Sequence, residues 1–157
     1  MIQSQAPLPS FEPAAPIRVA RIITRLNVGG PAIQATLLSE RLRPHGFDTR
    51  LIYGRLSPDE GDMTYLLNGR HVESAFIPSL QRSVSPADDA RALAAVIGEL
   101  RAFKPHIVHT HTAKAGTIGR AAAFAYNRFA RTAARTVHTY HGHSLEEIGR
   151  ASCRERV

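Results

Sequence analysis

The sequence predicts an α/β protein built on an open, doubly wound and mainly parallel sheet. Short segments rich in β-branched residues alternate along the chain with longer segments in which apolar residues recur at helical spacing. Glycine, proline or a helix-capping residue stands at most boundaries between the two kinds of segment. Such alternation forms βαβ units, and the right-handed crossovers of these units align the strands in parallel.

The first predicted unit begins at residue 17. Residues 17–26 (IRVARIITRL) are typical of a strand, and the NVGGP that follows Arg25-Leu26 is typical of a turn. Pro31 suits the first position of a helix, and periodic apolar residues continue that helix to His45-Gly46, where glycine is the common residue after a C-terminus. A second strand is predicted at residues 48–54.

The second half of the chain repeats this alternation. A third strand is predicted at residues 72–78, after a polar loop. Ser85-Pro86, followed by two aspartates, predicts a helix start with a hydroxyl cap and carboxylates in the first turn. This helix is expected to end at Lys104-Pro105, because proline cannot continue it. A strand, a helix and a strand are then predicted at residues 106–112, 115–130 and 135–141.

Both ends of the chain are expected to lie outside a domain at residues 17–147. Residues 1–16 hold four prolines and few large apolar side chains, which predicts a disordered leader and not a secretory signal. Residues 147–157 (EIGRASCRERV) back-translate to the start of a widely used sequencing adapter. Residues 148–157 are therefore predicted to be a non-native artefact, and the domain before them is expected to be incomplete.

Composition narrows the classes of function. The only cysteine, Cys153, lies in the predicted artefact, so no disulfide framework is expected, and this fits a cytoplasmic protein. No apolar run approaches the ~18 residues of a membrane span. The net charge is +7, to which three arginines and one glutamate of residues 148–157 contribute +2. This excess indicates a phosphate-bearing partner, an anionic membrane surface or merely solvated arginine, while no basic–aromatic module indicates nucleic acid.

Three turns are expected to meet at one edge of the sheet. In open parallel sheets, ligands bind beyond the carboxyl ends of the strands. NVGGP, HTHTAKAG and HTYHGH follow the first, fourth and fifth predicted strands. Gly29 and Gly30 before a helix can leave backbone N–H groups facing an anion, although a plain tight turn explains them too. Lys114 at the next helix start repeats the pattern, with a solvated lysine as the alternative. Neither a GxGxxG fingerprint nor a P-loop is present.

The histidines of this edge admit three interpretations. His109 and His111 lie two residues apart and project from the same side of a strand, as metal ligands do. No Cys, Asp or Glu flanks them and no zinc-binding spacing appears, so no metal is predicted. A structural role at strand ends stays open, as does a catalytic one in which imidazole donates to a sugar hydroxyl or moves a proton. Ser144 lacks a GxSxG elbow, which argues against a serine nucleophile.

Four stretches taken together resemble the N-terminal domain of family 4 glycosyltransferases: IITRLNVGGPAIQATLLSERL, IPSLQRSVSPADDARAL, PHIVHTHTAKAGTIGRAAA and VHTYHGH. The resemblance covers about residues 18–143. It implies a Rossmann-like half of a GT-B fold and transfer of a sugar from a nucleotide-sugar with retention of configuration. It also implies no metal in the active site and no cofactor besides the donor substrate. GGPAIQ departs from the family's Gly-Gly-Leu-Glu-like continuation, and the family's Glu-x7-Glu segment belongs to a second domain.

The resemblance also implies roles for single residues. It places Gly29 and Gly30 near the donor diphosphate and the acceptor, and it makes His141 the catalytic residue that reaches the donor sugar. His111 and Lys114 match positions on the acceptor side of the cleft. His143, in the same segment as His141, is also expected to bind substrate.

The expected partners follow from this family. They are a nucleotide-sugar donor, a sugar or lipid-linked acceptor, and a C-terminal domain of the same chain, without which a hexosyltransferase of this type is expected to be inactive. The basic helix at residues 115–130 indicates either peripheral contact with the inner face of the membrane or merely a solvated surface. Its basic residues are Arg120, Arg128 and Arg131, with Arg135 just beyond, and they accompany Phe124, Tyr126 and Phe129. Two alternatives stay open: a GT-B sugar-nucleotide epimerase and a non-catalytic Rossmann-like binding module.

Overall fold

The computed structural model describes residues 15–130 and 133–141. The predictions made for most of the leader, for Arg131, for His143 and for residues 148–157 fall outside these ranges.

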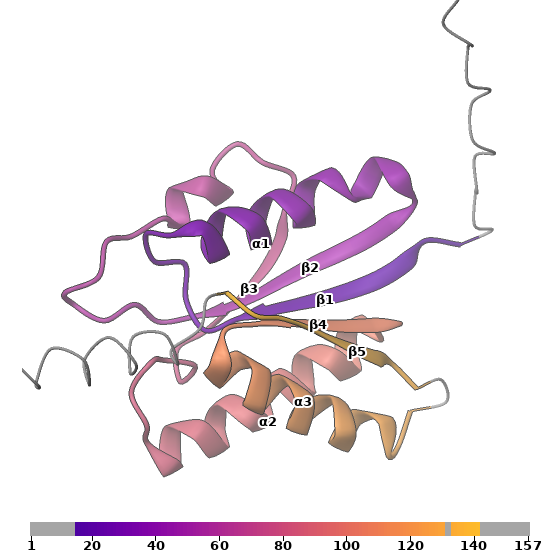
Figure 1. The fold of residues 1–157 in the computed structure, drawn as a ribbon. Coiled ribbons are helices and arrows are strands. Elements are labelled where there is room, and N and C mark those ends of the chain that lie inside the picture. Colours follow the sequence, from indigo (N-terminus) through magenta and orange to yellow (C-terminus); the bar gives the residue numbers. More distant parts are fainter. Residues whose placement is uncertain (1–14, 131–132, 142–157) are drawn as a thin grey trace, which may run out of the picture.

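The described residues form one five-stranded parallel sheet (Figure 1). Its strands lie in the order β3-β2-β1-β4-β5, and every neighbouring pair is parallel. The strand order reverses direction between β1 and β4, which is the topological switch point where such sheets bind ligands. The predicted open parallel sheet is confirmed. The strands are β1 (Ile17–Ile23), β2 (Phe47–Gly54), β3 (Glu73–Ile77), β4 (Ile107–His111) and β5 (Arg135–Thr139).

Three helices cover the two faces of the sheet, so the fold is doubly wound. Figure 1 shows α1 (Gly30–Arg41) on one face and both α2 (Pro86–Phe103) and α3 (Ala113–Asn127) on the other. Two short 3₁₀ helices, η1 (Arg43–His45) and η2 (Thr64–Leu67), lie in the connections. The carboxyl ends of the strands and the loops that follow them gather at the left of Figure 1.

Each face of the sheet has its own hydrophobic core. On the α1 face, Ile23 and Leu51 pack against small residues of the helix. On the α2–α3 face, Ile22 and Val108 belong to a larger cluster that both helices complete. Successive strand residues point to opposite faces, and this explains how adjacent Ile22 and Ile23 serve different cores.

Several boundaries differ from the sequence prediction, and two of them lie beside the candidate site. β1 ends at Ile23 and not at Leu26, because the chain turns there and the Leu26 carbonyl accepts a hydrogen bond from Met63 N at 2.9 Å. α3 begins at Ala113, two residues earlier than predicted, directly after β4. The predicted cap of α2 is confirmed: Ser85 Oγ accepts from Asp88 N at 3.4 Å, although that contact is long.

Glycine lets α3 lie close to the sheet. A Cβ added at Gly119 would come within 2.5 Å of Thr110 Cγ2 and 3.1 Å of Ile22 Cδ1. A Cβ at Gly116 would come within 2.6 Å of the His138 ring. The two glycines therefore set the helix against β4 and β5, and this close packing fixes where the first turn of α3 lies at the edge of the sheet.

Candidate functional site

Two threonines join the turns on either side of the switch point. Thr24 follows β1, Thr112 follows β4, and their Oγ1 atoms are 2.7 Å apart. Ala115 N, in the first turn of α3, donates to the same Thr24 Oγ1 at 3.2 Å. Thr112 has φ 68°, which is a rare conformation for a β-branched residue. Strained backbone of this kind persists where the surroundings fix it, and here the Thr24 hydroxyl does so.

The Gly29–Gly30 turn opens α1 toward the same edge. Gly29 has φ 156°, which residues with side chains rarely adopt, and its N–H lies 3.4 Å from Met63 Sδ. Gly30 differs, because a Cβ added there would meet no atom within 4 Å. The packing of this domain therefore does not require glycine at position 30. The first-turn N–H groups of a helix have no partner inside the helix, and no acidic residue lies in the first turn of α1, so this end can attract an anion.

The loop after β2 contacts the segment that leads into the Gly29–Gly30 turn. Val28 N donates to the Gly61 carbonyl at 3.1 Å. Arg25 forms an ion pair with Glu60 at 2.6 Å, and hydrogen bonding from Arg25 is the main reason that the pKa of Glu60 is lowered. Sequence reasoning did not identify this pair. Its members stand far apart in the chain, and no local pattern signals their contact.

Three histidines form what we call the histidine stack: His109, His111 and His141. The ring centroids of His109 and His111 are 4.3 Å apart, and those of His111 and His141 are 5.1 Å apart with the planes 26° from parallel. His111 Nδ1 and His141 Nε2 are joined by a hydrogen bond of 2.8 Å. His109 Nε2 bonds Thr139 Oγ1 at 2.8 Å. The structure thus brings together histidines from β4 and from the turn after β5.

The stack is neutral at physiological pH. Burial, with a smaller contribution from the charge of Arg21, lowers the pKa of His109 to about 4; for His111, burial and then the His109 and Arg21 charges lower the pKa to about 3. Burial and then the charge of His138 also lower the pKa of His141. Arg21 is itself buried in β1, where burial lowers its pKa to about 10 and its Nη1 donates to Ser39 Oγ at 2.8 Å.

His111 differs from the role implied for it. Its side chain has 0% exposure, so it presents no surface that an acceptor could touch in this conformation. Its Nε2 is buried and has no hydrogen-bond partner among residues 15–130 and 133–141. In the same part of the chain, no group of three or more His, Cys, Asp or Glu side chains is arranged to hold a metal ion.

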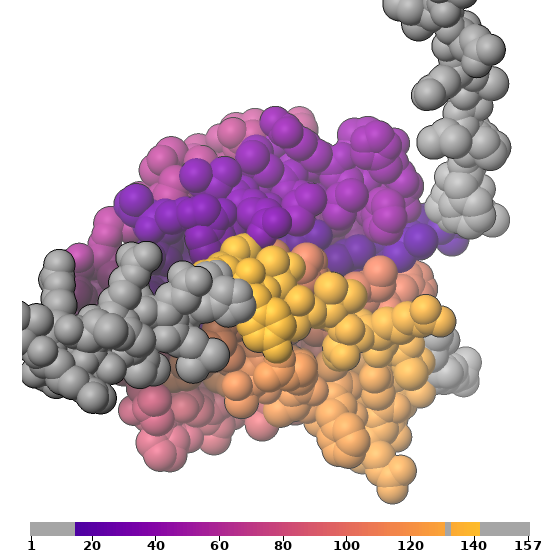
Figure 2. Space-filling view, in the orientation of Figure 1, coloured from indigo at the N-terminus to yellow at the C-terminus, as the bar shows by residue number. Residues whose placement is uncertain are grey.

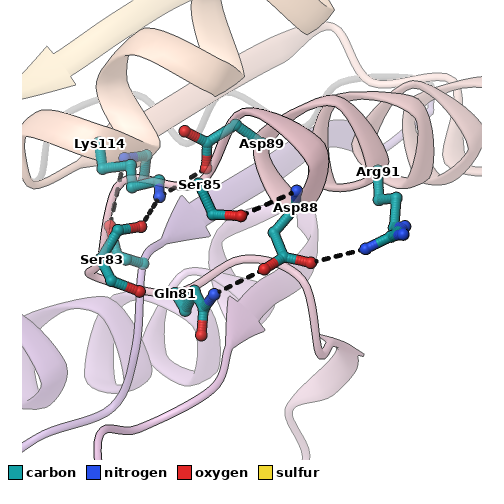
Figure 3. A network of polar contacts seen from close by, with 9 residues as sticks. Gln81, Ser83, Ser85, Asp88, Asp89, Arg91 and Lys114 are labelled. Atoms are coloured by element: carbon teal, nitrogen blue, oxygen red, sulfur yellow. Dashed lines mark hydrogen bonds and ion pairs between the residues drawn. The ribbon is translucent and has the colours of Figure 1, made fainter.

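Lys114 lies at the start of α3 and turns toward α2 (Figure 3). Its Nζ donates to the Ser83 carbonyl and lies 2.5 Å from Asp89 Oδ1. Asp89 was expected only to stabilise the first turn of its helix, and the structure shows that it also pairs with Lys114. This ion pair ties the N-terminal ends of α2 and α3 together at the edge of the sheet.

Comparison with known proteins places this site in a family. Residues 28–155 match the family model of Glycosyltransferase Family 4. The chain belongs to this glycosyltransferase family. The match extends into residues 148–157, whose non-native origin stays a prediction. A curated relative from Escherichia coli, named UDP-Gal:alpha-D-GlcNAc-diphosphoundecaprenol alpha-1,3-galactosyltransferase, is 35% identical over 113 residues, which are 72% of this chain. The chain spans only 27% of the length of that relative.

Solved structures confirm the expected fold. Acinetobacter baumannii MurG aligns with TM-score 0.60 and 13% identity over 86% of this chain and 39% of its own. Sucrose-phosphate synthase from Thermosynechococcus elongatus aligns with TM-score 0.59 and 14% identity over 88% of this chain and 37% of its own. UDP-GlcNAc 2-epimerase from Neisseria meningitidis aligns with TM-score 0.53 and 13% identity over 78% of this chain and 31% of its own. At these identities the likeness shows the fold alone, a Rossmann-like domain of the GT-B type.

The outer surface of α3 combines aromatic and basic side chains. Phe124 is 77% exposed, and Arg120 and Arg128 are exposed on the same stripe of the helix. Tyr126 was expected on this surface but is buried in the core beneath it, because it lies on the opposite side of the helix. No helix in the described part of the chain is long and apolar enough to cross a membrane.

Proposed function

We propose that this protein is the acceptor-side half of a retaining glycosyltransferase that moves a hexose from a nucleotide-sugar to an acceptor. The observation that carries the proposal is the geometry at the switch point. The open N-terminus of α1 at Gly29–Gly30 and the neutral ring of His141 flank the carboxyl ends of β1 and β4, in a chain of this family.

The chemistry of transfer fits these two groups. Breaking the bond to a nucleoside diphosphate leaves negative charge on the phosphates and positive character on the sugar. Backbone N–H groups fixed before the reaction stabilise the phosphate charge, and this kind of preorganisation is usually the largest contribution to catalysis. A neutral imidazole at His141 would hydrogen-bond the sugar and orient it. It would not act as the nucleophile.

The acceptor side is expected to include Lys114 and His143. We propose a lipid-linked acceptor, because the name of the E. coli relative describes one and because α3 exposes Phe124 between Arg120 and Arg128. Basic residues beside an exposed aromatic ring suit the interface of an anionic bilayer, where each cation contributes about 1 kcal/mol. The enzyme would then act at the cytoplasmic face of the membrane.

A second domain would complete the donor site. The chain spans 27% of the curated relative and at most 39% of the three solved structures described above. Closure of two domains around a substrate excludes water and completes a catalytic site. We therefore propose that this chain alone has no transferase activity.

The test uses the complete gene product with radiolabelled nucleotide-hexoses and a short polyprenyl-diphosphate sugar as acceptor. Label appearing in the lipid-linked product, with the anomeric configuration retained, supports the proposal. A change of stereochemistry in the nucleotide-sugar without acceptor would support the epimerase alternative, which shares this fold. Failure to bind any nucleotide-sugar would leave only a non-catalytic module.

A further inference from the structure

We propose that His111 is a positioning residue that decides which ring nitrogen of His141 carries the proton, so that His141 has an Nδ1–H donor available to a substrate. The use of that donor on a sugar rests on the proposed function. The protonation pattern itself does not.

A single proton lies between the two rings. His111 Nδ1 and His141 Nε2 are 2.8 Å apart, and both rings are neutral at physiological pH. A neutral imidazole carries one N–H and one lone pair. Two arrangements are therefore available: either His111 Nδ1–H donates to His141 Nε2, or His141 Nε2–H donates to His111 Nδ1.

The buried end of the His111 ring distinguishes these arrangements. If His141 were the donor, His111 would carry its own proton on Nε2, which is buried and has no partner among the described residues. A buried N–H without an acceptor is among the rarest defects in proteins, and a lone pair in the same place is tolerated better. The arrangement with His111 Nδ1–H should therefore dominate by a factor on the order of ten.

The charge of Arg21 favours the same arrangement. Arg21, from β1, is buried and close enough to the stack for its charge to lower the pKa of both His109 and His111. A lone pair on His111 Nε2 is attracted to a nearby cation, whereas an N–H is repelled by it.

The remaining groups around the rings come from four elements. From β4, His109 stacks on His111 and is held by Thr139. From β5, the charge of His138 acts on His141, and from α3 the charge of Arg120 acts on His138. α1 contributes the Ser39 hydroxyl to Arg21. No carboxylate pairs with the stack in residues 15–130 and 133–141, so nothing in that part of the chain stabilises a protonated ring.

The consequence for a substrate comes through His141. When its Nε2 accepts from His111, its proton must be on Nδ1, for which no hydrogen bond exists within the described residues. That nitrogen can then donate to a hydroxyl or phosphate oxygen of a substrate. The opposite tautomer would offer only a lone pair at the same point, and a phosphate oxygen would be repelled by it.

The experiment measures the ring tautomers directly in this chain by ¹⁵N NMR with long-range ¹H–¹⁵N correlations of the imidazoles at pH 7.5. The wild type should show His141 protonated on Nδ1 and His111 unprotonated on Nε2. His111→Leu should move His141 toward the Nε2–H form that free imidazole favours in water. His111→Asn should restore the wild-type pattern, because its amide N–H stands near the original Nδ1. His71→Asn, at an exposed histidine away from the stack, is the matched control and should change nothing.

Two results would overturn the proposal: a wild-type His141 protonated on Nε2, or an unchanged His141 tautomer in His111→Leu. The wild-type spectrum alone decides if the leucine variant does not fold. In the complete enzyme, His111→Leu should lower kcat about tenfold or more with little change in KM, and His111→Asn should recover much of it. An enzyme that transfers no sugar would refute the proposed function, while the tautomer measurement would still stand or fall independently.

Discussion

Gly30→Ala tests whether glycine at position 30 is needed for the fold or for binding a ligand. The added Cβ would meet no protein atom within 4 Å, so the folded domain should accept it without strain. Replacing glycine by alanine where the backbone permits it stabilises a protein by about 0.4–1 kcal/mol, chiefly by restricting the unfolded chain. For a chain of this size that corresponds to a rise in Tm of about 1–4 °C.

Gly98→Ala is the matched control for this change. Gly98 lies on the exposed side of α2, and a Cβ there also meets nothing within 4 Å. Both variants should therefore show the same small gain in Tm when this chain is heated in a calorimeter. They should differ in the complete enzyme, because only position 30 lies where the donor phosphates are expected to approach the backbone.

The predicted effect on activity is a fall in kcat/KM of about tenfold or more for Gly30→Ala, equivalent to ~1.4 kcal/mol of transition-state stabilisation. Gly98→Ala should keep wild-type activity. Steady-state kinetics with a nucleotide-sugar and acceptor measures both. If Gly30→Ala retained full activity, backbone approach of the donor at this turn would be wrong. If Gly30→Ala lowered Tm instead, the conclusion that a Cβ at this position meets no other atom would be wrong.

Three further perturbations test other parts of the structure. Lowering the pH from 6.5 to 5 should reduce the free energy of unfolding, measured by urea titration, by about 1 kcal/mol or more per pH unit. The reason is that the pKa of His111 is depressed in the folded protein, so over this range the unfolded chain binds a proton that the folded chain does not. A flat profile would mean that this ring is not buried. Gly119→Ala should lower Tm by several degrees in this chain, since its Cβ would sit 2.5 Å from a β4 side chain and overpacking costs about 1–3 kcal/mol; an increase would show that α3 can move away. Replacing both Arg120 and Arg128 by alanine should weaken sedimentation with anionic vesicles, whereas Arg41→Ala on α1 should not; equal binding to neutral vesicles would remove the electrostatic explanation.

The sheet was predictable because its determinants are local and repeated. β-branched runs alternate with helical periodicity, and parallel strands joined by right-handed crossovers leave few other topologies. The cap at Ser85 and the turn at Gly29–Gly30 were visible for the same reason. Errors appear where a contact distant in sequence decides the outcome. Leu26 has the residue type of a strand but leaves β1, because the loop after β2 supplies its hydrogen-bond partner.

The location of the site could be predicted from the sequence, but the contacts between its residues could not. The rule that ligands bind at the carboxyl ends of parallel strands located the edge, and the family resemblance pointed to its residues. The ion pair of Lys114 with Asp89 could not be foreseen, because it depends on how closely α3 packs beside α2. The position of α3 on the sheet is set by glycines whose role appears only once the helix is placed there.

The two similar histidine segments show how far a repeated pattern can mislead. β4 and β5 are neighbours, and in their register His111 lies beside Thr139 and not beside His141. His141 therefore stands two residues beyond the partner of His111, at the edge of the sheet, from where its ring reaches back over the buried one. The same sequence signal thus produces one histidine that is fully buried and another that is partly exposed at the edge of the sheet. Because a hydrogen bond joins the two rings, the buried His111 can act on a substrate only through the partly exposed His141.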